Sequence, residues 1–352
     1  MNEADKVNDG TAAARDEPGL TYILPLKSAV PHATAELAAY LSWLAGRAQV
    51  IVVDGSPADV FAAHAAGWRE SLCAGLVHVV PDQETPMGKV GGVLTGLRLA
   101  SHERVIIADD DVRYDDEALR RVAAALGPAD VVRPQNYFEP MPWHALWDTG
   151  RTLLNRVSGG DWPGTLGVRL SVLRATNGYD GRVMFENLEL VRTVVAAGGR
   201  ETALLDAYVR RRPSSVRHFW SQRVRQAYDE LARPARCIIQ LAALPLTLWL
   251  AITGRWIALL VIAAAIVVAA EIGRRRAGGT RVFPAAASAL APAWVLERAL
   301  CIWLAIGARV LLGGVPYRGQ RVRLAATPMR TLRVRHTAVR IHRQRESRDR
   351  SA

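Results

Sequence analysis

The chain has 352 residues, half of them hydrophobic, and a formal net charge of +12. This length allows one large domain and a smaller region. The three cysteines lie far apart, which excludes a disulfide-rich scaffold or a zinc site and favours a reducing compartment.

The positive charge is concentrated in one part of the sequence. Residues 317–350 contain eleven arginines against Glu346 and Asp349. Such a segment is typical of binding to nucleic acid or to anionic lipid. Because long apolar runs precede it, we expect a membrane partner and no nucleic acid. Only three of the basic residues are lysines, a bias typical of GC-rich bacterial genomes.

Residues 1–19 are polar and lack the apolar stretch of a signal peptide, so we expect a disordered leader. From residue 20, short apolar segments rich in Val and Ile alternate with segments of helical periodicity. Strands are predicted at residues 21–26, 48–56, 76–82, 104–111 and 130–134. Helices are predicted at residues 33–45, 58–68, 88–102 and 116–126. This alternation predicts an α/β domain with a mostly parallel sheet covered on both faces.

Residues 136–214 lose the clean alternation, and we expect them to complete this domain, which spans residues 20–214, and to cover its ligand. Residues 185–199 read as an amphipathic helix that stops at a glycine pair. Residues 215–236 are basic, aromatic and amphipathic, which predicts an interfacial helix resting on lipid headgroups.

Residues 237–313 form the predicted membrane region, with two to four short helices. Residues 237–253 carry no charge, and residues 256–272 are apolar up to a glutamate, so each run is just long enough to span a bilayer. The alternative is a hairpin of buried core helices. Residues 282–313 are apolar but interrupted by prolines and charges, which predicts a second hairpin or an interfacial segment.

One arginine cluster follows the second apolar run, and another is spread over residues 314–352, the predicted basic tail. By the positive-inside rule both clusters lie in the cytoplasm together with the α/β domain. This arrangement requires an even number of spans, two or four, in a multi-pass protein of the cell membrane.

Carboxylates follow two of the predicted strands, where ligands of such sheets bind. Asp54 ends one strand, and a D-x-D pair, Asp109 and Asp111, ends another. Such oxygens suit Mg²⁺ or Mn²⁺ bound to a diphosphate. The alternatives are a simple turn at Asp54 and a helix cap at the pair, although Asp115 and its neighbour are better placed for capping.

Three further charged residues accompany these carboxylates. Lys89 stands near the start of a glycine-rich helix, where it can bind phosphate, although the glycines match neither G-x-G-x-x-G nor a P-loop. Glu186 and Glu189 start the helix at residues 185–199. They are either partners of the helix dipole or general bases in the cleft.

Taken together, several motifs in order resemble glycosyltransferase family 2, the inverting enzymes of the GT-A fold, and most closely its membrane-bound, ceramide-glucosyltransferase-like members. The resemblance covers residues 20–320. The motifs are "VVDGS", "GKVGGVLTGL", "IADDDV", "GTLGVRLSVLRATNGYD", "FENLELVRTVVAAGG" and "FWSQRVRQ". The resemblance implies a Rossmann-like GT-A catalytic domain followed by a helical transmembrane region.

By position, the resemblance assigns Asp54 to the nucleoside of a sugar nucleotide, and Asp109 and Asp111 to the D-x-D motif, with Asp111 on the metal. Asp110 and Lys89 complete this part of the donor site. In "QRVRQ", Gln222 and Arg225 match the donor-binding Gln/Arg-x-x-Arg-Trp motif of membrane-associated members, and a glutamine replaces its tryptophan.

The acceptor side departs from the family pattern. The family usually has Glu-Asp, whose aspartate is the catalytic base, where this chain has Glu186 and Asn187. An asparagine cannot accept the proton, so Glu186 is the nearest substitute, with Glu189 or Asp180 behind it.

The resemblance therefore implies transfer of a sugar from a nucleotide donor, a UDP-sugar in our prediction, to a lipid or lipid-linked acceptor with Mg²⁺ or Mn²⁺. Two other hypotheses stay open. One is a processive polysaccharide synthase, which needs more spanning helices. The other is a degenerate scaffold of an envelope-synthesis complex, with Asn187 as its lesion.

Overall fold

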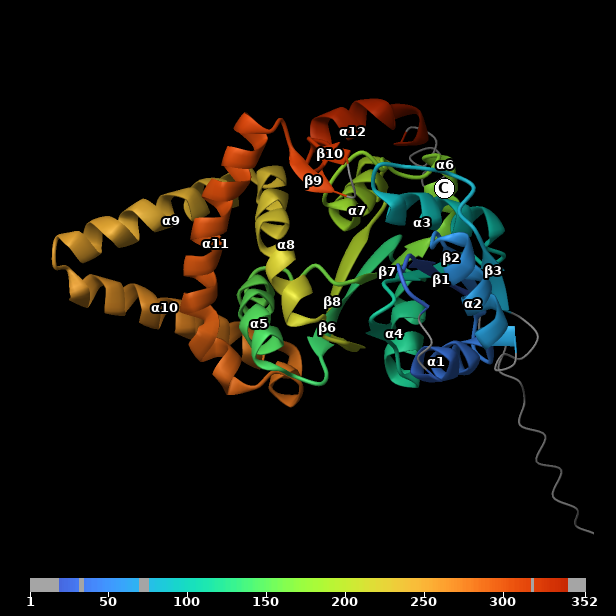
Figure 1. Cartoon of the computed structure of the whole chain (residues 1–352), viewed down its shortest axis with the longest axis horizontal. Coiled ribbons are helices and arrows are strands. Elements are labelled where there is room, and N and C mark those ends of the chain that lie inside the picture. The colour runs from blue at the N-terminus through green and yellow to red at the C-terminus, as the bar shows by residue number, and fades with distance from the viewer. Residues whose placement is uncertain (1–18, 32–34, 70–75, 318–319, 341–352) are drawn as a thin grey trace, which may run out of the picture.

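The structure, a computed structural model, describes residues 19–31, 35–69, 76–317 and 320–340. An α/β domain forms most of it, and a long helical hairpin projects from one side (Figure 1). The predicted leader, except residue 19, and the last part of the predicted basic tail lie outside the described residues.

Eight strands of the described chain form one mixed sheet. They are β1 (Leu20–Leu26), β2 (Gln49–Asp54), β3 (Leu76–Val79), β4 (Arg104–Ala108), β5 (Val112–Arg113), β6 (Val131–Phe138), β7 (Thr165–Arg169) and β8 (Glu201–Arg211). Their order is β3-β2-β1-β4-β7-β6-β8-β5. Strand β7 is antiparallel to β4 and β6, β5 is antiparallel to β8, and the other four pairings are parallel. The mostly parallel α/β sheet predicted from the sequence is confirmed.

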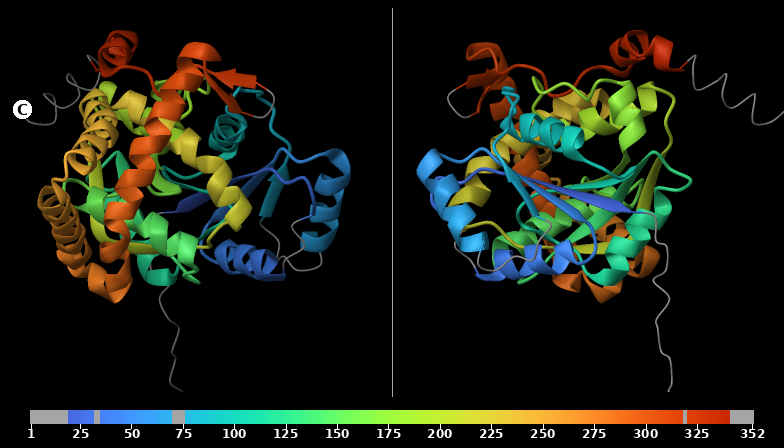
Figure 2. Two further views of the ribbon diagram at one scale, coloured as in Figure 1. Left: turned by 60° about the vertical axis from the view of Figure 1, so that its left-hand side comes forward. Right: turned by 90° about the vertical axis from the view of Figure 1, so that its right-hand side faces the viewer.

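Helices cover both faces of this sheet (Figure 2). They are α1 (Ala35–Ala45), α2 (Ala58–Arg69), α3 (Gly88–Leu99), α4 (Asp116–Ala125), α6 (Leu170–Ala175) and α7 (Glu186–Ala196). Successive strand residues point to opposite faces. Tyr22 and Leu24 therefore join the core beneath α1 and α4, whereas Ile23 joins the core beneath α3 and α7. The strands and helices predicted between residues 20 and 135 are confirmed.

The glycines of α3 serve helix packing. A Cβ on Gly96 would meet the side chain of Ile23, and one on Gly92 would lie 3.2 Å from Cβ of Pro25. Without side chains at these positions, α3 approaches β1 closely and brings its first turn, with Lys89, to the carboxyl edge of the sheet.

The remaining helices lie beside β6 and β8. They are α5 (Trp143–Arg156), α8 (Val216–Tyr228), α9 (Pro234–Ile252), α10 (Trp256–Arg275) and α11 (Ala285–Leu311), with short 3₁₀ helices η1 (Asp229–Ala232) and η2 (Arg276–Arg281). The single helix predicted for residues 215–236 is wrong, because α8 ends at Tyr228. Pro234 begins α9 and disfavours a helical conformation in Arg233, which has φ −130° and ψ 78°.

Helices α9 and α10 form a hairpin that extends away from the domain (Figure 1). Only 11% of the residues in each apolar window are buried. Large apolar side chains are exposed along both helices, among them Ile238, Ile239, Leu246, Trp249, Ile257 and Leu260. The alternative of a buried core hairpin is therefore wrong.

Helix α11 corrects the expectation of a second hairpin at residues 282–313, because these residues form one helix. The charges that interrupt its sequence face protein: Glu297 lies 3.4 Å from Arg223, and Arg298 is 2% exposed. By length and composition, α9, α10 with η2, and α11 could each span a membrane, although 39% of the α11 window is already buried.

The described part of the predicted basic tail, residues 314–317 and 320–340, is folded. It forms a hairpin of β9 (Val315–Tyr317) and β10 (Gln320–Val322), and then α12 (Met329–Arg335). Between them, the chain packs on the start of α7, where the carbonyl oxygens of Leu324 and Ala325 accept from the backbone of Met184 and Phe185, each at 2.8 Å. The basic composition of this segment therefore gave no indication that it folds against the α/β domain.

The contact between α10 and α5 is testable at one glycine. A Cβ on Gly273 would overlap the Leu153 carbonyl oxygen, so Gly273→Ala should lower the free energy of unfolding by about 1–3 kcal/mol. Gly307→Ala is the matched control, because that helical glycine has open space around it and alanine favours helix by about 1 kcal/mol. Thermal unfolding in detergent measures both. Equal stability of the two variants would contradict this packing.

Candidate active site

Two carboxylates of the Asp109-Asp110-Asp111 sequence meet one arginine beyond β4. Arg211, at the end of β8, places Nε 2.8 Å from Asp111 Oδ2 and Nη2 3.4 Å from Asp109 Oδ2. The Asp109 peptide nitrogen donates to the Gly164 carbonyl oxygen at 2.8 Å. The guanidinium group offsets the repulsion between the two carboxylates, so both can remain at this edge of the sheet.

Lys89 connects this pair to α7. Its Nζ lies 2.6 Å from Asp109 Oδ1 and 2.8 Å from Glu186 Oε1. Burial lowers the pKa of Lys89, but the two carboxylates outweigh burial and raise its pKa above the ordinary value. Lys89 is therefore a fixed positive charge between the D-x-D turn and the start of α7.

Asp111 has the chemistry of a cation ligand. Burial raises its pKa to about 6, against the opposing effect of Arg211. Its Oδ1 atom is buried and has no hydrogen-bond partner among the described residues. This free oxygen fits a hard divalent cation. The described chain holds no cluster of three or more His, Cys, Asp or Glu that could bind a metal by itself, so other oxygens would have to complete the coordination.

A cavity of about 180 Å³ opens beside these charges. Asp109 lines one part of it, Glu186 and Asn187 another, and Asp229 a third. The Asn187 side chain donates from Nδ2 to the Pro163 carbonyl oxygen at 2.9 Å, so its amide is fixed at the wall. The cavity thus joins the D-x-D edge of the sheet to the end of α8.

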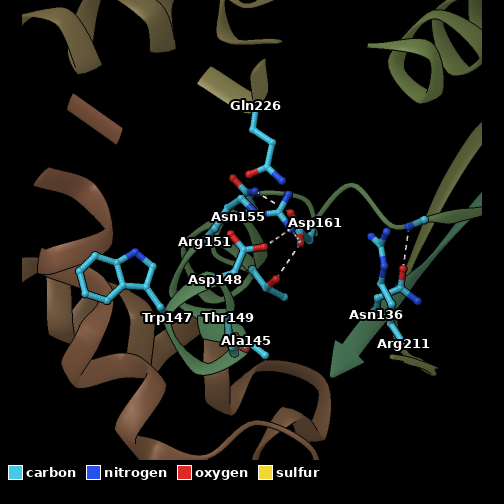
Figure 3. Close-up of polar contacts among 12 residues, drawn as sticks. Asn136, Ala145, Trp147, Asp148, Thr149, Arg151, Asn155, Asp161, Arg211 and Gln226 are labelled. Carbon is cyan, nitrogen blue, oxygen red and sulfur yellow. Dashed lines mark hydrogen bonds and ion pairs between the residues drawn. The ribbon is translucent and has the colours of Figure 1, made fainter. Parts of the chain in front are cut away.

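A polar network on α5 supports one wall of the cavity (Figure 3). Arg151 lies 3.4 Å from Asp148 and 3.3 Å from Asp161, and Arg223 of α8 lies 3.0 Å from Asp148. Burial raises the pKa of Asp148, but Arg151 and Arg223 outweigh it and hold the pKa well below its usual range. Gln226 accepts from Arg223 at 2.6 Å.

The structure places two of the three predicted bases away from this cavity. Glu189 is fully buried, and its Oε2 accepts from the Thr327 backbone at 2.7 Å. Asp180 pairs with Arg182 at 2.8 Å, which holds the pKa of Asp180 below its usual value. Of the three, Glu186 alone lines the cavity.

Asp54 is enclosed by protein rather than open to a ligand. Its side chain is fully buried, and Oδ2 lies 2.6 Å from Nδ1 of His64 and 3.2 Å from Nε2 of His78. Burial raises the pKa of Asp54, but hydrogen bonds from His78, Ser56 and His64 outweigh burial and hold it well below its usual range. Asp54 therefore shapes the turn after β2.

The other predicted donor residues lie outside the cavity lining. Gln222 donates to Ser221 at 3.1 Å, and the Arg225 guanidinium lies 5.1 Å from the ring centre of Tyr317. The Asp110 carbonyl oxygen accepts from Arg113 at 2.7 Å. Within "QRVRQ", the residues that reach the cavity and its supporting network are Gln226 and Arg223.

Sequence reasoning missed Arg211 and Asp229. Arg211 ends an eleven-residue strand and resembles its arginine neighbours, so no local pattern distinguishes it. Asp229 lies within residues 215–236, for which the sequence predicts a single amphipathic helix. The one signal that could have separated it is Pro234, which shows that the helix must end shortly before that residue.

The sequence profile described as Glycosyl transferase family 2 matches residues 33–168, which include the D-x-D turn. The α/β domain thus has the GT-A architecture, and the part of it within residues 33–168 is similar to glycosyltransferase family 2. No curated protein matched the chain.

Several solved structures are similar at low identity. Staphylococcus aureus TarS 1-349, in complex with UDP-GlcNAc, is 18% identical with a TM-score of 0.41, over 58% of this chain and 61% of that one. The mannosyltransferase PcManGT from Pyrobaculum calidifontis, in complex with GDP-Man and Mn²⁺, is 16% identical with a TM-score of 0.45, over 92% and 85%. The chain thus spans about three fifths of the TarS fragment.

The Lys89 ion pairs are testable by substitution. Lys89→Met leaves Asp109 and Glu186 without their shared cation, so the free energy of unfolding should fall by roughly 1–3 kcal/mol. A fully buried pair would lose about 3–5 kcal/mol, but Lys89 is 18% exposed.

Lys27→Met is the control, because Lys27 is exposed. Urea unfolding of both variants measures the effect. The double variant Lys89→Met/Glu186→Gln should recover part of the stability lost in Lys89→Met. If Lys27→Met lost as much stability as Lys89→Met, the role of Lys89 would be refuted.

Proposed function

We propose that the protein is an inverting glycosyltransferase that moves a sugar from a nucleotide donor, a UDP-sugar, to a lipid or lipid-linked acceptor. One observation carries this proposal: the D-x-D carboxylates, Lys89 and Arg211 converge at the carboxyl edge of the sheet beside a cavity. Ligands of open α/β sheets bind at this edge.

The donor end is suited to a diphosphate leaving group. Lys89 and Arg211 provide fixed positive charges where negative charge develops as the diphosphate departs, the kind of stabilisation that usually contributes most to catalysis. Asp111, with Asp109, would hold Mg²⁺ or Mn²⁺, which neutralises charge on the diphosphate. Asp54 would support the nucleoside side of the site through its turn, and Asp110, Gln222 and Arg225 remain proposed donor contacts.

At the acceptor end, a hydroxyl oxygen attacks the anomeric carbon from the face opposite the diphosphate. The new bond forms as the bond to the diphosphate breaks, and a base takes the hydroxyl proton. Glu186, Asp229 and Glu230 are carboxylates that line the cavity together with Asn187 and Asp109.

The C-terminal fold supports a membrane hairpin with cytoplasmic ends. Thr327, after α11, hydrogen-bonds Glu189 of the catalytic domain, so the chain must return to the side from which it left. An even number of crossings is required, and we propose that α9 and α10 cross while α11 stays against the domain. The arginines at residues 274–276 then lie on the same side as the domain, in agreement with the positive-inside rule.

This arrangement favours a lipid acceptor over the rival activities. A processive synthase needs a channel of several spanning helices, and two crossings do not form one. Arg233, the residue directly before α9, also lines the cavity, so a headgroup at the membrane surface would be close to it. A scaffold without activity is the reading that Asn187 favours, and the following experiment separates it from an enzyme.

Membranes containing the protein should be incubated with a panel of radiolabelled sugar nucleotides and Mg²⁺ or Mn²⁺, and the lipids then extracted. Label is expected in the lipid phase, and Asp111→Ala should reduce it at least about 100-fold, because the diphosphate loses its charge partner. Asp116→Asn is the control, since Asp116 lies in the first turn of α4 and pairs with Arg47 on the surface.

The other outcomes are equally informative. Label in a high-molecular-weight polymer would support a polysaccharide synthase. Absence of transfer from every donor by the folded protein would support the scaffold and overturn the proposed function.

A further inference from the structure

Asp229 occupies a special position in the chain. It is the first residue of η1, where α8 stops and the chain turns toward α9. It lines the same cavity as Asp109, Glu186 and Asn187. Its Oδ1 atom is buried and has no hydrogen-bond partner among the described residues. A buried carboxylate oxygen without a partner is costly, and such groups are found where a ligand or a reaction uses them.

The other carboxylates of the cavity wall are already engaged in ion pairs. Glu186 and Asp109 share Lys89. Glu230 lies 2.7 Å from Arg233 and 3.3 Å from Arg236. Within the described chain, Asp229 is the one carboxylate lining this cavity that makes no ion pair.

The surroundings of Asp229 raise the pKa of its carboxyl group into the neutral to slightly basic range. Burial is the main cause that raises its pKa to about 8, and the Glu186 carboxylate adds to it, whereas Arg233, Arg298 and Arg225 oppose the rise. The charged groups around it come from every neighbouring element: Glu186 of α7, Arg225 of α8, Glu230 of η1, Arg233 before α9, Arg298 of α11 and Arg151 of α5. A base is most effective when its pKa is close to the working pH.

We infer that Asp229 is the catalytic base of the glycosyl transfer, in place of the family aspartate that this chain lacks at Asn187. This assignment rests on the proposed function. As the acceptor oxygen bonds to the anomeric carbon, its proton passes to the Asp229 carboxylate, and the electron pair of the broken bond leaves with the diphosphate. Glu186 is a positioning residue that fixes Lys89 and strengthens the proton affinity of Asp229.

The acceptor class follows from where Asp229 lies. It precedes the first residue of α9 by five positions, and α9 is the first helix of the projecting hairpin. A base at this end suits a hydroxyl carried on a lipid headgroup.

The test measures steady-state transfer by the full-length protein in membranes, with the donor identified by the sugar-nucleotide panel. Asp229→Asn should lower kcat at least about 100-fold and leave the donor KM unchanged. It should not lower the unfolding temperature at pH 7, because the native carboxyl group is already protonated there. This measurement separates loss of the base from loss of the fold.

The pH dependence gives a second readout. In the unaltered enzyme, kcat should rise with pH up to about 8 and then level off, because only the ionised carboxylate accepts a proton. Glu186→Gln removes the negative charge that raises the Asp229 pKa, so the rise should move to lower pH while remaining visible. In Asp229→Asn this rise should disappear. With Asp229→Ala, added formate should restore part of the activity.

Failure of the two proposals gives different results. If the unaltered protein transfers no sugar, the proposed function and this assignment both fall. If it does transfer sugar and Asp229→Asn keeps the full rate and the same pH profile, the assignment to Asp229 alone is overturned. Loss of the pH-dependent rise in Glu186→Gln would instead make Glu186 the base.

Discussion

The site depends on the ion pairs that Lys89 makes with Asp109 and Glu186. Three segments far apart in sequence bring their charges to one edge of the sheet, and two of them are negative. Without a cation between them, the carboxylates would repel each other in a poorly hydrated site. Lys89 can occupy this position only because glycines let α3 lie close to β1. Backbone packing and electrostatics are therefore linked through one helix.

A second set of buried charges joins the apolar helices to the α/β domain. Arg223 lies 3.0 Å from Asp148 of α5 and 3.4 Å from Glu297 of α11. Charges in an apolar helix are costly unless they are paired, so these contacts fix which side of α11 faces protein. The exposed apolar surface is consequently concentrated on α9 and α10, with a further part along the outer side of α11.

The first half of the domain could be predicted because its periodicity is local. Neighbouring strand residues such as Val52 and Val53 belong to different cores, and Asp115 caps α4 through the Ala118 nitrogen at 2.7 Å, as expected. The D-x-D turn and Lys89 were likewise found from strand ends and helix starts. The rest depends on contacts between distant parts of the chain. Neither the Arg211 contacts nor the exposure of Asp229 to a cavity can be recognised from the neighbouring sequence. Residues 285–311 form one helix although charges interrupt their apolar pattern, because Glu297 pairs with Arg223.

The segment that follows α11 has a consequence for how the protein is made. The carbonyl oxygens of Leu324 and Ala325 complete the backbone hydrogen bonding at the start of α7, the element that carries Glu186. A ribosome delivers these residues only after α9 and α10 have been synthesised. The α/β domain therefore cannot complete its hydrogen bonding until α9 and α10 have been synthesised. In the membrane arrangement proposed above, the candidate site is finished only after the hairpin that would anchor it has been made.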